Sequence, residues 1–340
     1  MTLRRRLIRI LGIVLLLPPL LAGVAGWLVA PGFLHPIRRE LSEDLIREAD
    51  ASFAHSGGHR EDFDVQARDG SLLRGWIVRA DHPNGNWVLL FHGVADNRVG
   101  VVGQSEFLLR AGYSVVMMDA RGHGASDGPI ATYGWLERND TRAIIDALLA
   151  SDERRYISVQ MTDPFPPGKP RPAAPSPHIF ALGESMGAGI ALQSAAFEPR
   201  IEAVVAEASF ANLREASYDY AGLRRSPLLG KTLFAPFSWM LLYRGERLTG
   251  LPVADVSPEK AVVARAFPVL LICGEKDEAL PCRHTRRIYD AALGPKQLWE
   301  VPGAFHSAAL GFQPVEFPRR VLQFFANVAQ AKPVQQPDGR

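Results

Sequence analysis

Short apolar runs separated by longer amphipathic stretches make up most of the chain after residue 63. The first two runs, at 63–67 and 72–79, alternate apolar and polar positions around Asp69-Gly70, and this pattern predicts an opening β-hairpin. The later runs are continuous, as in strands that are covered on both faces. These continuous runs lie at residues 87–91, 113–118, 179–182, 203–206, 269–273 and 297–301.

Helical patterns fill the intervals between the continuous runs. Apolar residues recur at helical spacing around residues 135–150, 187–197, 283–292 and 315–329. Repeated alternation of strand and helix is typical of an α/β fold with a mostly parallel sheet. We therefore predict an α/β domain over residues 38–330, with helices on both faces of the sheet.

Two segments of this domain interrupt the alternation. Residues 161–177 contain seven prolines, which exclude a helix or a central strand and predict an extended surface loop. Residues 211–260 form a longer insertion with apolar helical character, which we interpret as a small cap over the sheet. Beyond the domain, the polar segment 331–340 is expected to be a disordered tail.

The N-terminal segment, residues 1–37, has the pattern of a membrane or export signal. Residues 10–37 carry no charged side chain, and residues 11–30 are long enough to cross about 30 Å of hydrocarbon as a helix. The positive-inside tendency places the preceding arginines in the cytoplasm and the body on the other side. We favour a retained single-pass anchor because the apolar run reaches a full spanning length. The alternative is a signal peptide cleaved near residues 23–25, which leaves a secreted or periplasmic protein. The arginines are Arg4, Arg5, Arg6 and Arg9.

Charge and cysteine content exclude several classes of protein. The formal net charge is +2, and without the four N-terminal arginines it is −2, whereas a nucleic-acid-binding body is normally basic. We therefore predict no nucleic-acid partner. Two cysteines in 340 residues exclude a disulfide scaffold and a four-cysteine zinc site, so a hydrophobic core must hold the fold together.

A nucleophile motif follows the continuous run at 179–182. Gly183-Glu184-Ser185-Met186-Gly187 has the form G-x-S-x-G and precedes a helix of small residues, which is the strand-turn-helix setting of a nucleophile elbow. The glycines permit the tight turn, and the turn projects the serine hydroxyl from the sheet edge. We therefore predict that Ser185 is the nucleophile, and that Gly183, Glu184 and Gly187 shape the site.

A serine nucleophile needs a base, and the base needs a carboxylate to orient it. Asp277 and His306 each follow a predicted strand, so parallel strands bring both to the same sheet edge as Ser185. We predict His306 as the base and Asp277 as the acid. Glu275 and Glu278 in the same loop compete with Asp277 for that role.

The oxyanion of acyl transfer is stabilised by backbone N–H groups near the nucleophile. Met186 N–H is one donor by its position after the serine. The second donor is predicted in the loop after residues 87–91, where we choose Val94 N–H over those of Gly93 and Ala95. His92 and Gly93 are expected to shape this loop.

A glycine-rich turn at residues 119–126 follows the next strand. Its spacing matches neither common phosphate-binding pattern, so we interpret it as structural support for the loop at residues 92–95.

These motifs together resemble the α/β-hydrolase superfamily, and more narrowly its serine aminopeptidase-like and monoacylglycerol-lipase-like branch. The resemblance runs from about residue 63 to residue 328. It implies an eight-stranded, mostly parallel sheet, acyl-serine catalysis, no metal and no organic cofactor. The landmarks are His92-Gly93, residues 119–126 and 183–187, Asp255-Val-Ser-Pro258 with Pro268, Gly274-Glu-Lys-Asp277 with Pro281, and His306-Ser307.

The activity expected from the resemblance is that of a serine hydrolase cleaving lipid-like or small acyl esters. One alternative is a serine peptidase, for which Glu184 beside the nucleophile is a weak sign of an acidic pocket for an amine. Another is a catalytically silent, membrane-tethered scaffold. The expected partners are a small-molecule or lipid ester and the membrane, with no protein partner.

The two cysteines flank the loop that carries Asp277. Cys273 belongs to a predicted strand, and a cysteine buried in a strand behaves as a small apolar residue. We therefore expect two independent thiols. A disulfide to Cys282 is the alternative, since the predicted compartment is oxidising.

Overall fold

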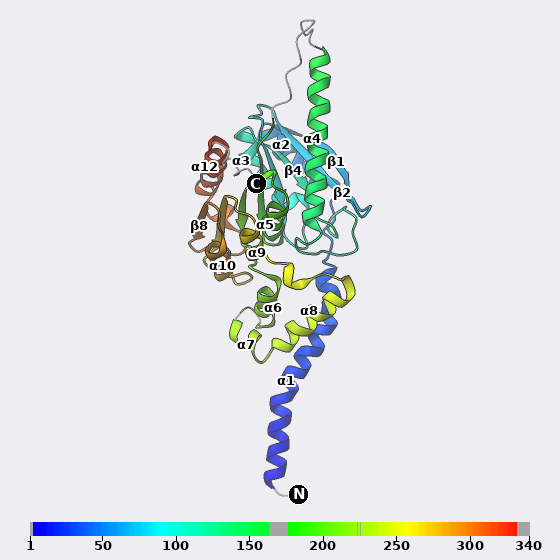
Figure 1. Cartoon of the computed structure of the whole chain (residues 1–340), viewed down its shortest axis with the longest axis vertical. Helices are drawn as coiled ribbons and strands as arrows, with labels where there is room; N and C mark the ends of the chain where they lie inside the picture. The colour runs from blue at the N-terminus through cyan, green and yellow to red at the C-terminus, as the bar shows by residue number, and fades with distance from the viewer. Residues whose placement is uncertain (1–2, 163–175, 223, 225, 332–340) are drawn as a thin grey trace, which may run out of the picture.

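The computed structural model describes residues 3–162, 176–222, 224 and 226–331, and its centre is an eight-stranded sheet (Figure 1). The strand order is β1-β2-β4-β3-β5-β6-β7-β8. Strand β2 is antiparallel to both of its neighbours, and the pairs from β4 to β8 are parallel. The predicted mostly parallel sheet is therefore confirmed. The strands are β1 (Gly58–Gln66), β2 (Leu72–Ala80), β3 (Trp87–Phe91), β4 (Ser114–Met118), β5 (Ile179–Glu184), β6 (Ile201–Glu207), β7 (Val269–Gly274) and β8 (Lys296–Val301).

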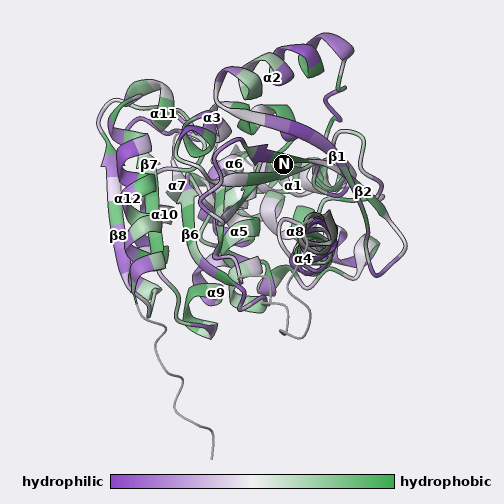
Figure 2. Ribbon diagram, turned by 90° about the horizontal axis from the view of Figure 1, so that it is seen from above, coloured by the Kyte–Doolittle hydropathy of each residue, from purple (hydrophilic) through white to green (hydrophobic). Residues whose placement is uncertain are grey.

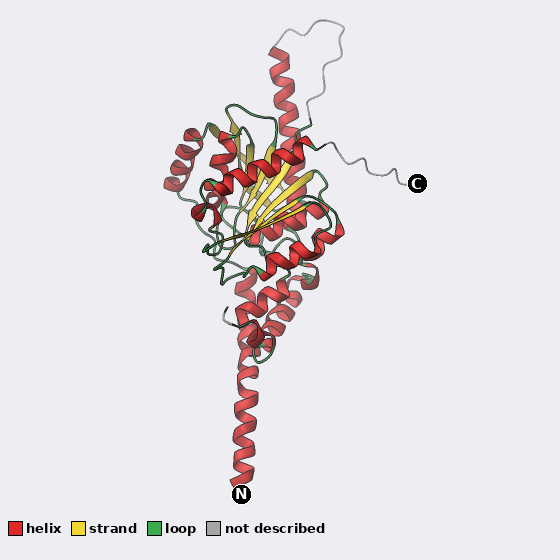
Figure 3. Cartoon of the chain, turned by 90° about the vertical axis from the view of Figure 1, so that its left-hand side faces the viewer, coloured by secondary structure: helices red, strands yellow, loops and turns green. Residues whose placement is uncertain are grey.

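Alternate residues of the central strands enter two separate hydrophobic cores. In β3, Val88 and Leu90 lie in one core, whereas Trp87 and Leu89 lie in the other. Helices cover both faces of the sheet, which explains why these strands are continuous apolar runs (Figure 3). One face carries α2 (Glu43–His55), α3 (Val102–Arg110) and α12 (Glu316–Gln330), and the other carries α4 (Glu137–Thr162), α5 (Met186–Phe197), α9 (Pro258–Ala264) and α10 (Arg283–Ala291).

Helix α2 is amphipathic and lies on the surface of the body. Ser42 caps it, because its Oγ accepts a hydrogen bond from Leu45 N–H at 3.3 Å. Ala49 and Phe53 are its buried side chains, and hydrophilic residues colour much of its ribbon (Figure 2).

The insertion at residues 211–260, referred to below as the cap, is helical as the sequence predicts. It follows β6 and precedes the strand β7, and it lies at the end of the body from which α1 extends (Figure 1). Its elements are α6 (Leu213–Ala221), α7 (Pro227–Lys231), α8 (Ala235–Thr249) and η2 (Val253–Asp255), followed by the start of α9. Two short helices elsewhere are η1 (Arg98–Val101) and α11 (Ala309–Phe312).

Helix α1 (Leu3–Leu34) has two different halves. Its first half projects beyond the body with exposed apolar side chains, and 5–34 is long and apolar enough to cross a membrane. Its second half packs along α8. Its buried residues recur every three or four positions, and all of them except Leu34 are small. They are Gly23, Gly26, Ala30 and Leu34.

The proline-rich segment begins later in the structure than the sequence predicts. Helix α4 extends to Thr162, so the prediction of a loop from residue 161 is wrong for its first two residues. The first proline is Pro164, and the residue that a proline bars most directly from the helical conformation is the one before it, residue 163, so the helix ends at Thr162. The rest of the predicted loop up to residue 175, and the predicted disordered tail from residue 332, lie outside the described residues.

Candidate active site

Ser185 lies on a sharp turn between β5 and α5. Its backbone has φ 53° and ψ −117°, a left-handed conformation that only a well-supported turn maintains in a residue other than glycine. Its N–H donates to the Glu207 carbonyl of the neighbouring strand at 2.9 Å. A Cβ at Gly183 would lie 2.4 Å from the Gly187 carbonyl oxygen, and one at Gly187 would lie 2.2 Å from that of Phe91. The motif glycines are therefore required by close backbone contact.

The structure brings Ser185, His306 and Asp277 together in one hydrogen-bonded chain. His306 Nε2 lies 2.8 Å from Ser185 Oγ, and His306 Nδ1 lies 2.7 Å from Asp277 Oδ2. The Asp277 carboxylate is buried, and its Oδ1 accepts hydrogen bonds from the N–H groups of Ala279 and Leu280, both at 2.8 Å. The carboxylate favours the tautomer with a proton on Nδ1, which leaves Nε2 free to accept the serine proton.

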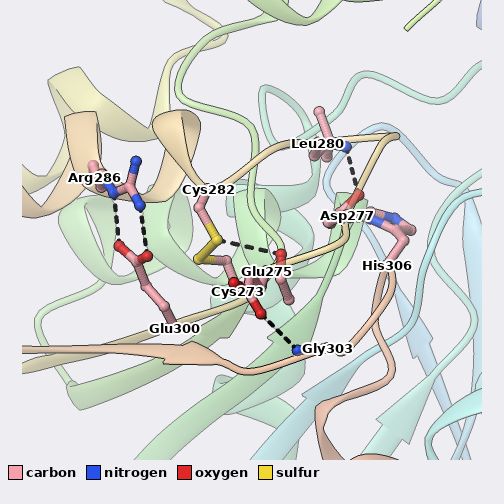
Figure 4. Close-up of a disulfide and its surroundings, with 10 residues drawn as sticks. Cys273, Glu275, Asp277, Leu280, Cys282, Arg286, Glu300, Gly303 and His306 are labelled. Carbon is pink, nitrogen blue, oxygen red and sulfur yellow. Dashed lines mark hydrogen bonds and ion pairs between the residues drawn. A yellow bond between two sulfur atoms is a disulfide. The ribbon is translucent and has the colours of Figure 1, made fainter. Parts of the chain in front are cut away.

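A disulfide joins the two ends of the loop that carries Asp277, referred to below as the acid loop. Cys273 and Cys282 form a disulfide, with Cα atoms 5.5 Å apart, on either side of Asp277 (Figure 4). The expectation of two independent thiols is therefore wrong. Burial of Cys273 in β7 does not prevent pairing, because the chain turns back and brings Cys282 to the end of the same strand. Glu275, the competing acid, faces away from His306 and accepts a hydrogen bond from Gly303 N–H at 2.9 Å.

The loop after β3 meets the same site from the other side. Val94 and Met186, whose N–H groups are the predicted oxyanion donors, line a cavity together with Ser185. His92 is buried, and its ring nitrogens bind the Gly93 carbonyl at 2.7 Å and the Ala120 N–H at 3.0 Å. Burial lowers the pKa of His92. A neutral imidazole with both nitrogens engaged joins two loops and has no proton-accepting atom left for substrate.

The turn at residues 119–126 is organised around Asp119. This buried carboxylate accepts hydrogen bonds from Arg98 Nη2 at 2.9 Å, Arg98 N–H at 2.8 Å and Ala125 N–H at 2.8 Å. Ser126 Oγ in turn donates to the Asp119 carbonyl at 2.7 Å. The turn supports the His92 loop, as the sequence predicts, but the role of Arg98 was not apparent because a charged residue 21 positions away looks like an ordinary surface residue.

Two acids lie close to Ser185, Glu207 buried and Glu184 partly buried. Glu184 and Glu207 are paired across β5 and β6. Burial, together with Glu207, raises the pKa of Glu184 to about 8, and burial raises the pKa of Glu207 to about 7. Glu184 Oε2 accepts a hydrogen bond from Gln104 Nε2 at 3.1 Å, and Glu207 Oε1 accepts one from Ala309 N–H at 2.8 Å. Glu184 is therefore mostly protonated near neutral pH, and Glu207 titrates in that range.

The cavity beside Ser185 has a volume of about 280 Å³ and a mostly apolar wall. Its lining comes from the end of α1, the loops that follow β3, β4, β5 and β6, the cap, and the acid loop. No acidic side chain is among the described residues that line it. The lining residues are Val29, Gly32, Phe33, Pro36, Val94, Tyr133, Ser185, Met186, Phe210, Leu213, Ala216, Ser217, Tyr220, Phe237, Leu241 and Leu280.

Sequence reasoning missed the contribution of α1 to this wall. The charge-free run was interpreted only as a membrane or export segment, although Val29, Gly32 and Phe33 line the cavity. The available signal was the spacing of Gly23, Gly26 and Ala30, because small residues at three- and four-residue intervals mark a helix face that packs closely on another helix.

Comparisons with known proteins agree with the architecture. Residues 86–232 match the model of the α/β-hydrolase fold family. The chain is 26% identical to the uncharacterized protein YqkD of Bacillus subtilis, over 86% of this chain and 89% of that protein. It is 25% identical to the lysophosphatidylserine lipase ABHD12 of Danio rerio, over 87% of this chain and 74% of that protein.

A solved structure shares the fold over most of the chain. The Pyrococcus furiosus esterase Pf2001 superimposes with a TM-score of 0.61 at 21% identity, over 87% of this chain and 98% of that one. The narrower branch inferred from the sequence stays a prediction. Taken with the eight-stranded sheet and the family-model match over residues 86–232, these similarities show that the chain has the α/β-hydrolase fold.

Proposed function

We propose that this chain is a membrane-tethered serine hydrolase that cleaves carboxylic esters with lipid-like acyl chains. The observation that carries the proposal is the hydrogen-bonded chain from Ser185 through His306 to Asp277, at the edge of an apolar cavity. A serine in reach of an oriented imidazole is the arrangement that acyl transfer requires. The names of an esterase and a lysophospholipid lipase among the similar proteins support the same class of substrate.

In the proposed reaction, Ser185 Oγ attacks the ester carbonyl carbon while His306 Nε2 takes the serine proton. The negative charge that develops on the carbonyl oxygen is stabilised by the N–H groups of Val94 and Met186. The imidazolium, oriented by Asp277, then gives its proton to the departing alcohol, and an acyl-serine remains. Water attacks this acyl group with His306 again as base, which releases the carboxylic acid and restores Ser185.

Peptidase activity is the less well supported alternative. Glu184 was the feature that suggested an acidic pocket for an amine, yet its carboxyl is hydrogen-bonded to Gln104 and is absent from the cavity lining. An apolar wall favours an acyl chain over a charged terminus, because burying an unpaired ammonium group is costly.

We also propose that α1 is a retained anchor rather than a cleaved signal. Its first half is an exposed apolar helix preceded by arginines, and its second half is packed against the cap. Cleavage near residues 23–25 would cut α1 within the face that packs on α8 and separate Gly23 from Gly26 and Ala30. Resistance of the full-length protein to extraction from membranes at high pH, with the N-terminal sequence intact, is the expected result.

The activity is tested by labelling the full-length protein with a fluorophosphonate probe, which reacts only with an activated serine. We expect labelling of the wild type and its loss in Ser185→Ala and His306→Ala, with Ser209→Ala as the matched control. Hydrolysis of p-nitrophenyl esters should fall by about 10⁴-fold or more in Ser185→Ala. A folded wild type that neither labels nor turns over esters would contradict the proposal and favour a silent scaffold.

A further inference from the structure

The last turns of α1 form one side of the cavity beside Ser185. Val29, Gly32, Phe33 and Pro36 are four of its lining residues, and they face Phe237 and Leu241 of α8. A segment that serves only to hold a domain at a membrane has no need to reach the reacting serine. The position of these residues therefore indicates that α1 has a second role beside anchoring.

Several contacts hold this part of α1 in a defined place. Tyr133 Oη donates to the Phe33 carbonyl at 2.7 Å, and the two rings stack with centroids 4.7 Å apart. Ala131 N–H donates to the Leu34 carbonyl at 2.9 Å, and the Arg38 guanidinium donates to the Ser126 carbonyl at 2.6 Å. The end of α1 and the residues just after it are thus hydrogen-bonded to one loop of the body, at residues 126–133.

Gly32 leaves room in the cavity that any other residue would occupy. A Cβ built at Gly32 meets no atom within 4 Å, in contrast to Gly26, where it would lie 2.1 Å from the Phe237 carbonyl oxygen. Gly32 lies within a helix and has no positive φ that would require glycine. The space beside it is therefore open to a ligand.

The length of α1 places the cavity relative to a bilayer. A helix rises 1.5 Å per residue, so about 30 Å of hydrocarbon beginning after Arg9 ends near Val29. The cavity wall thus begins where the apolar interior of a bilayer ends. An acyl chain is the ligand whose chemistry matches both the wall and the adjoining hydrocarbon.

We propose that the C-terminal turns of α1 are the wall that sets the acyl-chain length of the substrate, with Gly32 admitting a long chain. This inference rests on the proposed esterase activity and adds the substrate class, which is a long-chain acyl ester. The anchor is then also a specificity element, and Val29 and Gly32 are the positions that determine how much chain enters.

The test compares full-length wild type with Gly32→Leu and Gly12→Leu in the same detergent. Gly12 is the matched control, because its Cβ also meets nothing within 4 Å but it lies far from the cavity lining on the same helix. The measured quantity is the ratio of kcat/KM for p-nitrophenyl dodecanoate to that for the butanoate. We expect Gly32→Leu to lower this ratio by about tenfold or more, since blocking a single methylene site changes discrimination by roughly 10- to 200-fold.

A second variant keeps the inference testable if Gly32→Leu does not fold. Val29→Phe adds bulk to the same wall at a half-exposed position and should lower the ratio in the same direction. A ratio that changes less than about twofold in both variants, or that changes equally in Gly12→Leu, would overturn the inference. Failure of the proposed activity is distinguishable, because then the wild type hydrolyses neither ester and Ser185 is not labelled.

Discussion

The carboxyl edge of the sheet and the cap with α1 enclose the same cavity, but different forces hold them. At the sheet edge, buried charges and hydrogen bonds fix each loop: Asp119 binds Arg98, and Asp277 binds His306 and two backbone N–H groups. At the cap, small residues of α1 pack on α8, and large apolar side chains such as Leu228 and Trp239 stay 70% and 58% exposed.

This difference matches two requirements of a hydrolase. Atoms that exchange protons must stay within hydrogen-bond distance, and buried polar networks supply that rigidity. An acyl chain needs only an apolar wall of suitable depth, and packing contacts supply most of it, while Asp219 of α6 joins the cap to Arg283 and His284 of the body. Changes at the sheet edge should therefore cost more stability than changes at the cap.

The largest expected loss of stability follows from breaking the Asp119 network. Asp119→Asn keeps the size of the side chain but leaves the Arg98 guanidinium buried without its carboxylate. We expect the free energy of unfolding to fall by about 3–5 kcal/mol, as for other buried pairs that lose one partner. Chemical denaturation of the full-length protein in detergent measures this.

The control for this prediction is Asp64→Asn, which removes an acid paired with Arg74 at a half-exposed site. Exposed pairs contribute about 0–1 kcal/mol. Equal losses in the two variants would show that the sheet edge does not depend on its buried charge.

The pH dependence of stability should reveal the acids close to Ser185. The pKa of Glu184 is raised to about 8 in the folded protein from an ordinary value of 4.5. Between these values the folded state binds a proton that the unfolded state has released, so stability falls as pH rises. One such group changes the free energy of unfolding by at most about 1.4 kcal/mol per pH unit, or roughly 3 kcal/mol between pH 5 and 8.

Glu184→Gln removes the titrating group and should flatten this decline, which thermal unfolding at a series of pH values measures. Glu153→Gln changes an exposed acid on α4 and serves as the matched control. A wild-type stability that rises from pH 5 to 8, or an equally steep decline in Glu184→Gln, would contradict the assignment of a protonated carboxyl at this position.

Loss of the disulfide should have the next largest effect. The bridge closes a short loop around Asp277, and the chain-entropy model assigns a loop of that length about 2–3 kcal/mol. Replacing both Cys273 and Cys282 by serine should lower the free energy of unfolding by that amount. Dithiothreitol should destabilise the wild type and leave the double variant unaffected. Two titratable thiols in the denatured, unreduced wild type would exclude the bridge.

The sheet and the cluster of Ser185, Asp277 and His306 at its edge were predictable from sequence because they depend on local pattern and a topological rule. Continuous apolar runs gave β3 its bounds, and the meeting of parallel strands at their carboxyl ends placed Ser185, Asp277 and His306 close together. The disulfide was not predictable, because pairing depends on a Cα separation that the sequence does not encode locally.

The wall formed by α1 was hidden for another reason. An apolar, charge-free run satisfies the requirements of a membrane span and of a buried pocket equally well, so hydropathy alone does not separate its two halves. Only the contact with α8 distinguishes the exposed residues of the first half from Gly26 and Ala30, which are buried.

The smallest effect is expected where α1 meets α8. It tests directly whether the cap can loosen while the sheet edge keeps its structure. Gly26→Leu places a side chain where a Cβ alone would lie 2.1 Å from the Phe237 carbonyl oxygen, so the two helices must separate. Overpacking of this kind costs about 1–3 kcal/mol. Apolar packing dominates where α1 meets α8, with the Arg244 side chain donating to the Trp27 carbonyl. We therefore expect faster proteolysis within the cap while fluorophosphonate labelling of Ser185 persists.

Gly12→Leu provides the matched change on the exposed half of α1, where the added side chain meets no atom of the body, and its proteolysis pattern should resemble that of the wild type. If Gly26→Leu made the cap sensitive to proteolysis and also abolished labelling of Ser185, the cap and the sheet edge would form a single cooperative unit. The sheet edge would then depend on the apolar wall opposite it. The two regions would unfold together although different contacts dominate in each.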